Sequence, residues 1–576
     1  MRRIPAVTHA AVLAAVLTCG CGGSREAAPA ADGPPAEKED PNMEARRFLD
    51  EYNAKFAELE KTQTLAYWEA ATTGAKEAWD AFAAADLALK RFHSDKARFS
   101  RIEELRKAGG LEPLVARSLE VAWLAFKGNQ LEPDIIEKMV KMSTEIGQAF
   151  NNFRGELDGK KRSNNDLQSM IEKERKSDRR RRIWEALKQV GGAVGPPIVE
   201  LAKVRNEAAR QLGYADYWEM QVRLQEYEPA MLLSIFAELE EQTREPFVRM
   251  KAELDADVAK RLGKPVGELM PWDYDNPFFQ EAPPMAALNL DEFYSNKPQE
   301  EIAEIALRFF DDIGLDVRDI VERSDLYERE NKDQHAFCIS IDRAGDVRTL
   351  LNIKPNEKWM GTMLHEQGHA IYDKLIDRAL PFNLREMAHI FTTEAVAMLF
   401  GALSKNPTWL VAYAGADPTR VAEVETEIYE QRRREQLIFA RWAMVMLYFE
   451  KDMYENPDRD LNALWWDHVE RLQMLKRPPE RNEPDWASKP HFTIAPVYYH
   501  NYQMGELYAA QLRHKLSRIA GHEGPTRSLS FNGRKDFGEF LTREVFLPGR
   551  KLPWPEFVKQ TTGEPLSARS FAGELK

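Results

Sequence analysis

The sequence predicts an all-α, mainly helical fold, and three observations support this prediction. Apolar residues recur at three- and four-residue intervals through most of the chain after Met43, which is the spacing of one helix face. Proline and glycine are sparse in residues 44–92, so the helices there should be long. One stretch, residues 335–353, has the composition of strands instead. The length of 576 residues suits one large helical unit with two lobes, or two to three domains.

The N-terminus has the form of a signal peptide. Arg2 and Arg3 precede a short, mostly apolar stretch, residues 6–17, which is too short to span a membrane comfortably. This stretch ends in LTCGCGGS, which resembles a bacterial lipoprotein box, where a cysteine that follows a small residue is lipidated. Cys21 fits the box better than Cys19, which is the alternative. Ordinary secretion without a lipid is a second alternative.

These features predict three segments. Residues 1–21 are expected to be a lipoprotein-type signal peptide, and residues 22–42, rich in Ala, Pro and charge, a disordered tether. Residues 43–576 are expected to form a single helical domain with two lobes. The protein would then be exported and held by lipid on the periplasmic side of a bacterial cell envelope, or be secreted in soluble form.

The middle of the chain continues the helical pattern, in residues 133–153, 180–190 and 196–222. The pairs Gly191-Gly192 and Pro196-Pro197 are expected to break these helices. Residues 267–285, rich in Pro, Asp and aromatic residues, should form a loop. Residues 335–353 place β-branched and aromatic residues around a Gly-Asp turn and predict a β-hairpin. Such a strand can pair with an extended peptide backbone.

The charge of the chain argues against one class of partner. The formal net charge is -13, whereas a nucleic-acid surface needs clustered positive charge. The basic run Arg179–Arg182 lies among acidic residues and indicates a solvated helix face. Three cysteines support neither a disulfide framework nor a cysteine-based zinc site. Cys338 stands alone and is expected to behave as a small hydrophobic residue.

A short motif, MLHEQGHAIY at residues 363–372, predicts a metal site. In a helix, His365 and His369 lie one turn apart on the same face, and two neutral imidazoles at that spacing can hold one Zn²⁺. Glu366 lies beside the first ligand and can reach a zinc-bound water without binding the metal. The motif is short enough to occur by chance, so other residues must complete the site.

A third ligand is expected in the next helical stretch, HIFTTEAVAMLFGAL. Glu394 is its one acidic residue, and small and apolar residues follow it. A carboxylate there would be costly to bury without a partner, and zinc would supply one. The alternative is that Glu394 lies near the helix start and is exposed. His389 and Glu386 compete for the role but lie in a more polar stretch.

With these motifs the chain resembles the angiotensin-converting-enzyme family of zinc peptidases, in a bacterial form. It is more distantly similar to the thimet and neurolysin oligopeptidases. The resemblance runs from about Met43 to near the C-terminus and is strongest in QHAFC, LHEQGHAIYDKL, TTEAVA and KPHFTIAPVYYHNYQMGELYAAQL. It implies a two-lobed zincin with a deep central channel and a short β-hairpin beside the zinc site.

The resemblance also implies roles for single residues. His365, His369 and Glu394 match the zinc ligands, and Glu366 matches the general base. The other matching positions are His335 and Ala336, which contact the substrate; His491 and Tyr502, which stabilise the oxyanion; and Lys489 and Tyr499, which bind the substrate's C-terminal carboxylate. Each of these could instead be an ordinary core or surface residue, and Tyr498 competes with Tyr499 for its role.

Three positions depart from the family pattern. A carboxylate-binding Gln in a Trp-rich loop has Tyr274 as its nearest equivalent here. The chloride-binding Arg before the oxyanion Tyr is replaced by Asn501, so chloride activation is doubtful. An Asp that supports a zinc histidine is replaced by Met398, and such supporting carboxylates tune metal affinity.

The resulting functional prediction is a zinc metallopeptidase with one Zn²⁺ per chain. It would hydrolyse oligopeptides and release C-terminal dipeptides, using a zinc-bound water activated by Glu366. One alternative is an endo-acting oligopeptidase. Another is a catalytically inactive relative that binds peptides at the envelope. The sequence predicts a lipid anchor but no nucleic-acid partner, and it specifies no oligomeric state.

Overall fold

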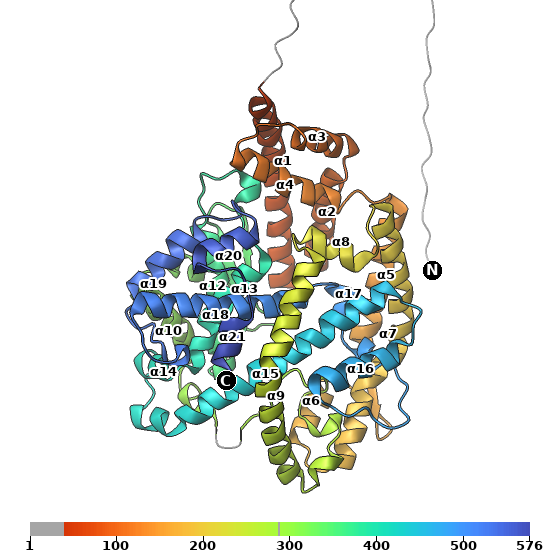
Figure 1. Ribbon diagram of the computed structural model, residues 1–576, viewed down its shortest axis with the longest axis vertical. Helices are drawn as coiled ribbons and strands as arrows, with labels where there is room; N and C mark the ends of the chain where they lie inside the picture. The colour runs from red at the N-terminus through yellow and green to blue at the C-terminus, as the bar shows by residue number, and fades with distance from the viewer. Residues whose placement is uncertain (1–39, 286–287) are drawn as a thin grey trace, which may run out of the picture. The chain divides into compact units, whose positions relative to one another are not determined.

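The computed structural model describes residues 40–285 and 288–576, and Pro41–Lys576 form one compact unit (Figure 1). The predicted signal peptide, both N-terminal cysteines and most of the predicted tether lie outside the described residues, so these expectations remain predictions. The expected mainly helical fold is confirmed. Among the described residues, strands occur only in two antiparallel pairs, β1–β2 and β3–β4.

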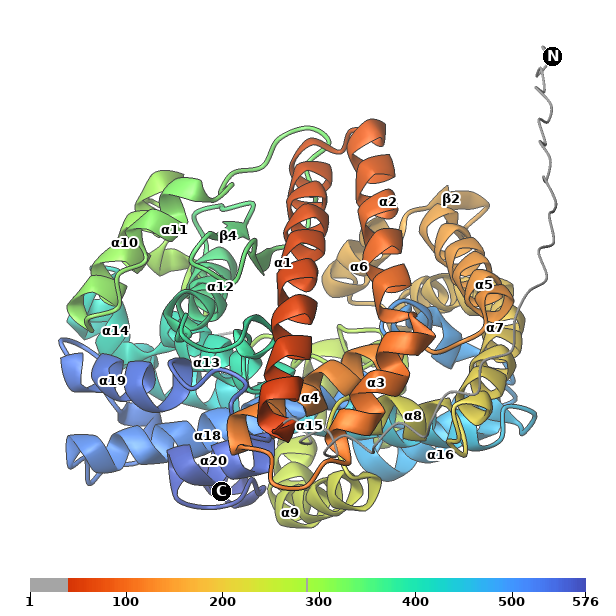
Figure 2. The same ribbon diagram turned by 90° about the horizontal axis from the view of Figure 1, so that it is seen from above.

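The N-terminal helices form a group with its own small core. They are α1 (Pro41–Thr73), α2 (Lys76–His93), α3 (Lys96–Arg106) and α4 (Pro113–Lys127). Figure 2 shows α1 and α2 running side by side. Aromatic rings fill the core between them: Tyr52 lies 5.5 Å from Phe56 and 5.8 Å from both Phe92 and Phe126, measured between ring centroids. Phe382, from far along the chain, joins this cluster.

The next group of helices surrounds the long helix α7. It comprises α5 (Pro133–Asn152), α6 (Asn164–Lys173), α7 (Ser177–Gln211), α8 (Tyr217–Leu224) and α9 (Pro229–Leu262). A hairpin that the sequence did not predict, β1 (Gly155–Leu157) with β2 (Lys160–Arg162), packs on α7.

The expected break at Gly191-Gly192 and Pro196-Pro197 is wrong, because α7 runs through both pairs. Packing explains Gly191 and, one turn later, Gly195. A Cβ atom on Gly191 would lie 2.2 Å from the carbonyl oxygen of Pro484, and one on Gly195 would lie 3.0 Å from the Pro484 side chain. The glycines therefore allow a distant segment to approach the helix closely rather than ending it.

The predicted β-hairpin at residues 335–353 is confirmed, and it lies in the part of the fold that contains the metal motif. Its strands are β3 (Phe337–Ser340) and β4 (Val347–Leu350), paired with Phe337 opposite Leu350. The helices of this part are α10 (Gln299–Asp312), α11 (Arg318–Arg323), α12 (Glu357–Leu375), α13 (Ile390–Gly401) and α14 (Pro407–Ala412). Helices α12 and α13 pack directly on each other, and β3 lies against α12.

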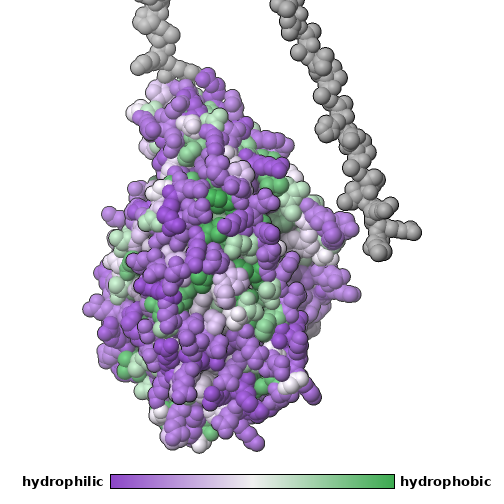
Figure 3. Space-filling model, turned by 90° about the vertical axis from the view of Figure 1, so that its right-hand side faces the viewer, coloured by the Kyte–Doolittle hydropathy of each residue, from purple (hydrophilic) through white to green (hydrophobic). Residues whose placement is uncertain are grey.

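The C-terminal helices complete the unit. They are α15 (Pro418–Glu455), α16 (Leu461–Gln473), α17 (His491–Ile494), α18 (His500–Ala520), α19 (Lys535–Phe540), α20 (Trp554–Thr562) and α21 (Arg569–Glu574). Helix α18 packs across α13. None of the described helices has the length and apolar character needed to cross a bilayer. Hydrophilic side chains dominate the face shown in Figure 3, and apolar ones gather in patches near its middle.

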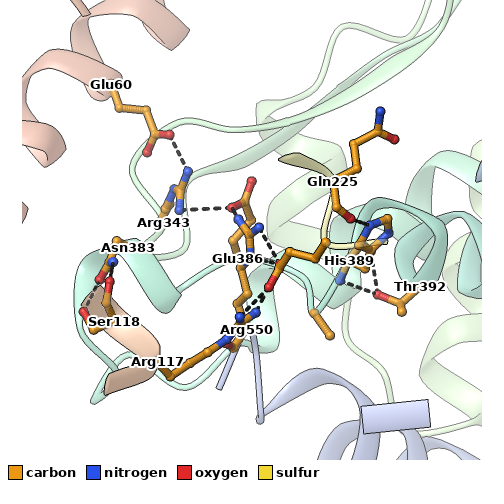
Figure 4. A network of polar contacts seen from close by, with 12 residues as sticks. Glu60, Arg117, Ser118, Gln225, Arg343, Asn383, Glu386, His389, Thr392 and Arg550 are labelled. Atoms are coloured by element: carbon orange, nitrogen blue, oxygen red, sulfur yellow. Dashed lines mark hydrogen bonds and ion pairs between the residues drawn. The ribbon is translucent and has the colours of Figure 1, made fainter. Parts of the chain in front are cut away.

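A row of alternating charges ties the N-terminal helices to the metal-motif part (Figure 4). Arg343, in the turn of the β3–β4 hairpin, bonds to Glu60 of α1 and lies 3.6 Å from the Glu386 carboxylate. Arg550 then links Glu386, at 3.2 Å, to Glu226, at 2.8 Å. The row ends at Arg117, which pairs with Glu226, so it contains three basic and three acidic side chains. Such a buried row holds its elements in register because breaking one pair leaves a charge uncompensated.

Candidate metal centre

The motif residues lie in the middle of α12, whose first turn is capped by the Asn356 side chain, which accepts a hydrogen bond from the Trp359 amide. Glycines set the close approach of α12 to α13. A Cβ atom on Gly368 would lie 2.9 Å from the Cα atom of Ala397, and one on Gly401 would lie 3.3 Å from the His365 side chain. This contact brings Glu394 of α13 opposite the two imidazoles.

His365, His369 and Glu394 form the one group of three or more potential metal ligands found among the described residues. The two Nε2 atoms are 3.2 Å apart, and Glu394 Oε2 lies 3.8 Å from His365 Nε2 and 3.9 Å from His369 Nε2. Ligand atoms about 2.0–2.1 Å from a tetrahedral zinc stand about 3.3 Å from one another. The three groups therefore fit one Zn²⁺ and leave the fourth position open.

The electrostatics of these residues also fit a cation. Burial lowers the pKa of His365 to about 4 and that of His369 well below its usual value, so both imidazoles are neutral, as a metal ligand must be. Burial raises the pKa of Glu394 to about 7. No Lys or Arg among the described residues pairs with Glu394, which is 9% exposed. A buried carboxylate of this kind needs a cation, and a bound zinc ion supplies it.

Two hydroxyl groups support the ligands. Thr393 Oγ1 lies 2.7 Å from His369 Nδ1, and the Tyr498 hydroxyl donates to Glu394 Oε1 over 3.4 Å. The absence of an Asp at Met398 is thus offset at His369 by Thr393. Sequence reasoning missed this residue, although a polar residue directly before a buried ligand was a signal that could have identified it.

Glu366 lies beside the ligands without joining them. It is 7% exposed and lines a cleft of about 840 Å³ together with His365. Burial, followed by repulsion from the Glu394 carboxylate, raises the pKa of Glu366 to about 8. A divalent cation held by the three ligands opposes both effects, because it stabilises the ionised carboxylates.

The residues matched to oxyanion stabilisation lie together on α17 and the start of α18. The ring centroids of His491 and Tyr499 are 5.0 Å apart, and those of Tyr499 and Tyr502 are 5.4 Å apart. Burial lowers the pKa of His491 to about 4, and its Nδ1 atom has no partner. Burial and the Glu394 carboxylate raise the pKa of Tyr502 to about 12, so its hydroxyl keeps its proton as a hydrogen-bond donor.

Lys489 and Tyr499 meet in a small group with a residue that the sequence analysis did not identify. Lys489 Nζ donates to Gln280 Oε1 over 2.6 Å, and Trp442 Nε1 donates to the Tyr499 hydroxyl over 2.7 Å. The Lys489 ammonium lies 5.4 Å from the Tyr499 ring centroid. Burial lowers the pKa of Lys489 to about 8.

The expected loss of an amide at this group, with Tyr274 as the nearest equivalent of the Gln, is therefore wrong. The Tyr274 hydroxyl donates to Asp255 over 2.6 Å and accepts from Lys251 over 2.8 Å. Gln280, six residues later in the same loop, supplies the amide at Lys489. The loop contains two short 3-10 turns, and their path, which no local pattern specifies, decides which residue reaches the lysine.

His335 and Ala336 immediately precede β3 and are placed differently. The His335 side chain is exposed and lines a separate cavity of about 480 Å³ with Pro490 and Ile494. Ala336 packs partly into the core. His335 therefore does not line the cleft that contains Glu366.

β3 has an open edge. The Ile341 amide donates to the Asp346 carbonyl, so with the observed register the odd-numbered residues of β3 bond to β4. The backbone groups of Ala336, Cys338 and Ser340 then point to the other edge, where no described strand pairs. The far edge of β4 is covered, because Asp325 bonds to both Thr349 and Leu351.

Asn501 stands where the resemblance implies a chloride-binding Arg, and both polar atoms of its side chain are hydrogen-bonded within the protein. Its Oδ1 accepts from the Tyr227 hydroxyl over 2.7 Å, and its Nδ2 donates to Gln225 Oε1 over 2.8 Å. The side chain is buried. An amide with neutral partners occupies this position in place of a guanidinium and its counter-ion.

Comparison with known proteins adds two family matches. Residues 170–575 match the model of peptidase family M3, and residues 39–262 match that of angiotensin-converting enzyme. Angiotensin-converting enzymes of Mesocricetus auratus and Mus musculus are each 22% identical over 440 residues, which is 71% of this chain and 33% of theirs. Carboxypeptidase 1 of Bacillus subtilis is 24% identical over 302 residues, which is 47% of this chain and 56% of that protein.

These matches locate the chain among zinc metallopeptidases. The chain spans only about a third of the length of the angiotensin-converting enzymes that it matches. The family M3 match, in contrast, covers well over half of the chain and includes His365, His369 and Glu394. The chain therefore belongs to peptidase family M3, a family of zinc metallopeptidases, and is similar in its N-terminal part to angiotensin-converting enzyme.

Proposed function

We propose that this protein is a zinc-dependent peptidase that removes dipeptides from the free C-terminus of oligopeptides. The observation that carries the proposal is the group of Lys489, Gln280 and Tyr499 next to a cleft that contains Glu366. A buried ammonium beside an amide and a phenol is a suitable binding site for a carboxylate. Its nearness to the metal ligands would limit how many residues follow the cleaved bond.

Each residue at the centre has a role in this reaction. When bound, zinc polarises the scissile carbonyl and lowers the pKa of water. The Glu366 carboxylate accepts the proton of the attacking water and passes it to the leaving amine. His491 and the Tyr502 hydroxyl donate hydrogen bonds to the carbonyl oxygen as negative charge develops on it. Because such donors act mainly in the transition state, Tyr502→Phe should lower kcat by about two to three orders of magnitude.

The open edge of β3 supports a peptide as the substrate. Ala336, Cys338 and Ser340 offer backbone N–H and C=O groups that an extended peptide can pair with as an added strand. Main-chain pairing of this kind aligns a peptide without regard to its sequence. It suits an enzyme that positions the scissile bond by the backbone and chooses its site by the terminal carboxylate.

The test compares one peptide as the free acid and as the C-terminal amide, with products identified by mass spectrometry. The free acid should yield dipeptides and be cleaved faster, because the amide cannot form the charge-assisted bond to Lys489. Lys489→Met should remove most of the difference between the two peptides. Equal rates for both peptides, with products that are not dipeptides, would overturn the proposal of dipeptide release.

An endo-acting oligopeptidase is the second candidate, and the shape of the cleft favours it. The lining continues from His365 back along α12 to Lys358, which is about 10 Å at the rise of a helix. Lys405 and Arg432 line the same region. Such a cleft can hold more than two residues beyond the cleaved bond, so longer products would support this reading.

A catalytically inactive, peptide-binding relative is less well supported, since the three zinc-ligand residues, Glu366, His491 and Tyr502 are all present.

We also propose export and lipid attachment through Cys21, from the form of the N-terminus. A Cys21→Ser variant should lose its partition into detergent. If it partitions like the wild type, Cys19 or another anchor is responsible.

A further inference from the structure

A cluster of aromatic rings lies beside β3, at the end of the α1–α2 pair where α1 finishes and α2 begins. We propose that Tyr67, Trp79 and Phe82 form a subsite for a large apolar or aromatic side chain of the bound peptide. This inference rests on the proposed function, because it assumes a peptide paired with β3. It extends that function by naming the class of side chain that the protein selects.

The three rings are in contact with one another and with the strand. The ring centroids of Tyr67 lie 5.2 Å from Phe82 and 6.2 Å from Trp79, and those of Trp79 and Phe82 are 6.0 Å apart. Tyr67 also lies 5.2 Å from the ring of Phe337, the first residue of β3. Trp79 is nevertheless 38% exposed. The cluster thus presents free aromatic surface directly beside the open strand.

The cluster is held in place by the segment that leads into β3. The Asp333 amide donates to the Ala71 carbonyl over 2.9 Å, and Arg329 donates to the Thr72 carbonyl over 2.8 Å. A Cβ atom on Gly74 would lie 2.2 Å from the Asn331 carbonyl oxygen, so the turn between α1 and α2 packs tightly on this segment. The rings therefore keep a defined position relative to Ala336.

The two faces of β3 point to different surroundings. Phe337 faces α1, through its contact with Tyr67. Cys338 faces α12, because Thr349, directly opposite it on β4, accepts a hydrogen bond from Gln367 of α12 over 3.1 Å, and directly opposite side chains lie on the same face. Odd-numbered side chains thus face the aromatic cluster and even-numbered ones face the metal centre.

A peptide paired along the open edge must repeat this alternation. Side chains at directly opposite positions of paired strands lie on the same face. Every second residue of the peptide therefore points towards α12, and the residues between them point towards α1 and α2, where the aromatic cluster lies. Strand-addition sites generally obtain specificity in this way, from pockets for alternate side chains.

The chemistry of the cluster selects the side chain. Exposed aromatic surface is best covered by another apolar or aromatic group, and an aromatic pair contributes beyond the area that it buries. At the usual strength of such a pair, a peptide with Phe at a well-placed position should bind about tenfold more tightly than the same peptide with Ala there. A charged side chain there would lose hydration without gaining a partner.

The test measures peptide affinity by calorimetry on the zinc-loaded Glu366→Gln protein, so the result does not depend on turnover. The probes are peptides of Ala, Ser and Gln with one Phe moved along the chain. Affinity should rise about tenfold at alternate positions only. Adding Trp79→Ala should remove this period-two pattern, whereas Trp79→Phe should retain it. Leu87→Ala is the matched control, because Leu87 is 46% exposed on the same helix two turns away.

An affinity profile that Trp79→Ala leaves unchanged, or one without alternation, would overturn the inference and mean that the rings only pack α1 against α2 and the hairpin. Failure of the proposed function is a separate result. It would appear as absence of hydrolysis by the wild-type protein, whatever the affinity profile of the Glu366→Gln protein.

Discussion

At the scale of single residues, the candidate metal centre differs from the pattern that the resemblance implies, because a hydroxyl and not a carboxylate supports one ligand. His369 Nδ1 meets the neutral Thr393 hydroxyl over 2.7 Å. For Nε2 to bind metal, the proton of the imidazole must be on Nδ1, which then donates to Thr393 Oγ1. The hydroxyl thus sets both the tautomer and the orientation of the ring.

Removing this hydroxyl should weaken zinc binding. In Thr393→Val, the shape of the side chain is kept but Nδ1 loses its partner, so zinc affinity should fall by about 10–100-fold. Competition with a chromogenic chelator measures this directly. Thr393→Ser keeps the hydroxyl and should bind zinc like the wild type. Equal zinc affinity in the Val variant would mean that the ring is oriented by packing alone.

The charge of Lys489 should make substrate binding depend on pH. Burial lowers its pKa to about 8, so the ammonium is charged below that pH and loses its proton as the pH rises through it. KM for a free-acid peptide should therefore rise above about pH 8, whereas KM for the matching amide should change little. A bound carboxylate raises the lysine pKa, so kcat at saturation should respond at a higher pH than kcat/KM.

The control for this effect is Lys489→Met, which should give a flat KM profile over the same pH range. If KM for the free acid does not change between pH 7 and pH 9.5 in the wild type, Lys489 does not bind the carboxylate.

At the scale of elements, the β3–β4 hairpin is fixed by the side chain in its turn. Arg343 lies between the rings of Phe56 and Phe382, 5.3 Å from each centroid, and pairs with Glu60 and Glu386. These contacts join the hairpin to α1 and to the segment before α13. The Arg343 guanidinium therefore helps to fix the position of β3 relative to Glu394.

Arg343→Met should destabilise the protein strongly. The change leaves the largely buried Glu60 carboxylate without its partner and leaves Glu386 with Arg550 alone, which should cost about 3 kcal/mol of unfolding free energy. Urea denaturation followed by circular dichroism measures this loss. Arg348→Met is the matched control in the same hairpin, because Arg348 pairs with Asp346 alone and both side chains are more exposed, at 22% and 26%, than those of Arg343 and Glu60, at 11% and 14%. The loss should therefore be smaller, about 1 kcal/mol. Similar losses in both variants would contradict the anchoring role.

Some of the helices and strands could be predicted from the local sequence, and others could not. The long helices and the hairpin at residues 335–353 follow local periodicity and turn chemistry, so they could be predicted. The continuity of α7 could not, because Gly191 meets Pro484, almost 300 residues later. The β1–β2 hairpin has strands of only three residues, too short to show an alternating pattern.

The candidate site divides in the same way. The positions of His365, Glu366 and His369 on one helix follow from the motif. Gln280 could not be found, because its contact with Lys489 depends on the path of a loop more than 200 residues away along the chain.

At the scale of the whole molecule, one compact unit contains the candidate metal centre, the open edge of β3 and the group of Lys489, Gln280 and Tyr499. His365, His369 and Glu394 are expected to hold zinc, whereas Glu366 is expected to move the proton. Substitution of a metal ligand and substitution of the general base should therefore have different effects. A ligand is needed for the metal itself, whereas the base is needed only for turnover.

The most direct test measures bound zinc and kcat on the same preparations of wild type, Glu366→Gln and Glu394→Gln. We expect one zinc per chain in the wild type and in Glu366→Gln, with kcat in that variant lower by about two to four orders of magnitude. Glu394→Gln should lose both zinc and activity. Stoichiometric zinc with undiminished kcat in Glu366→Gln, or full zinc retention in Glu394→Gln, would contradict the roles of these residues.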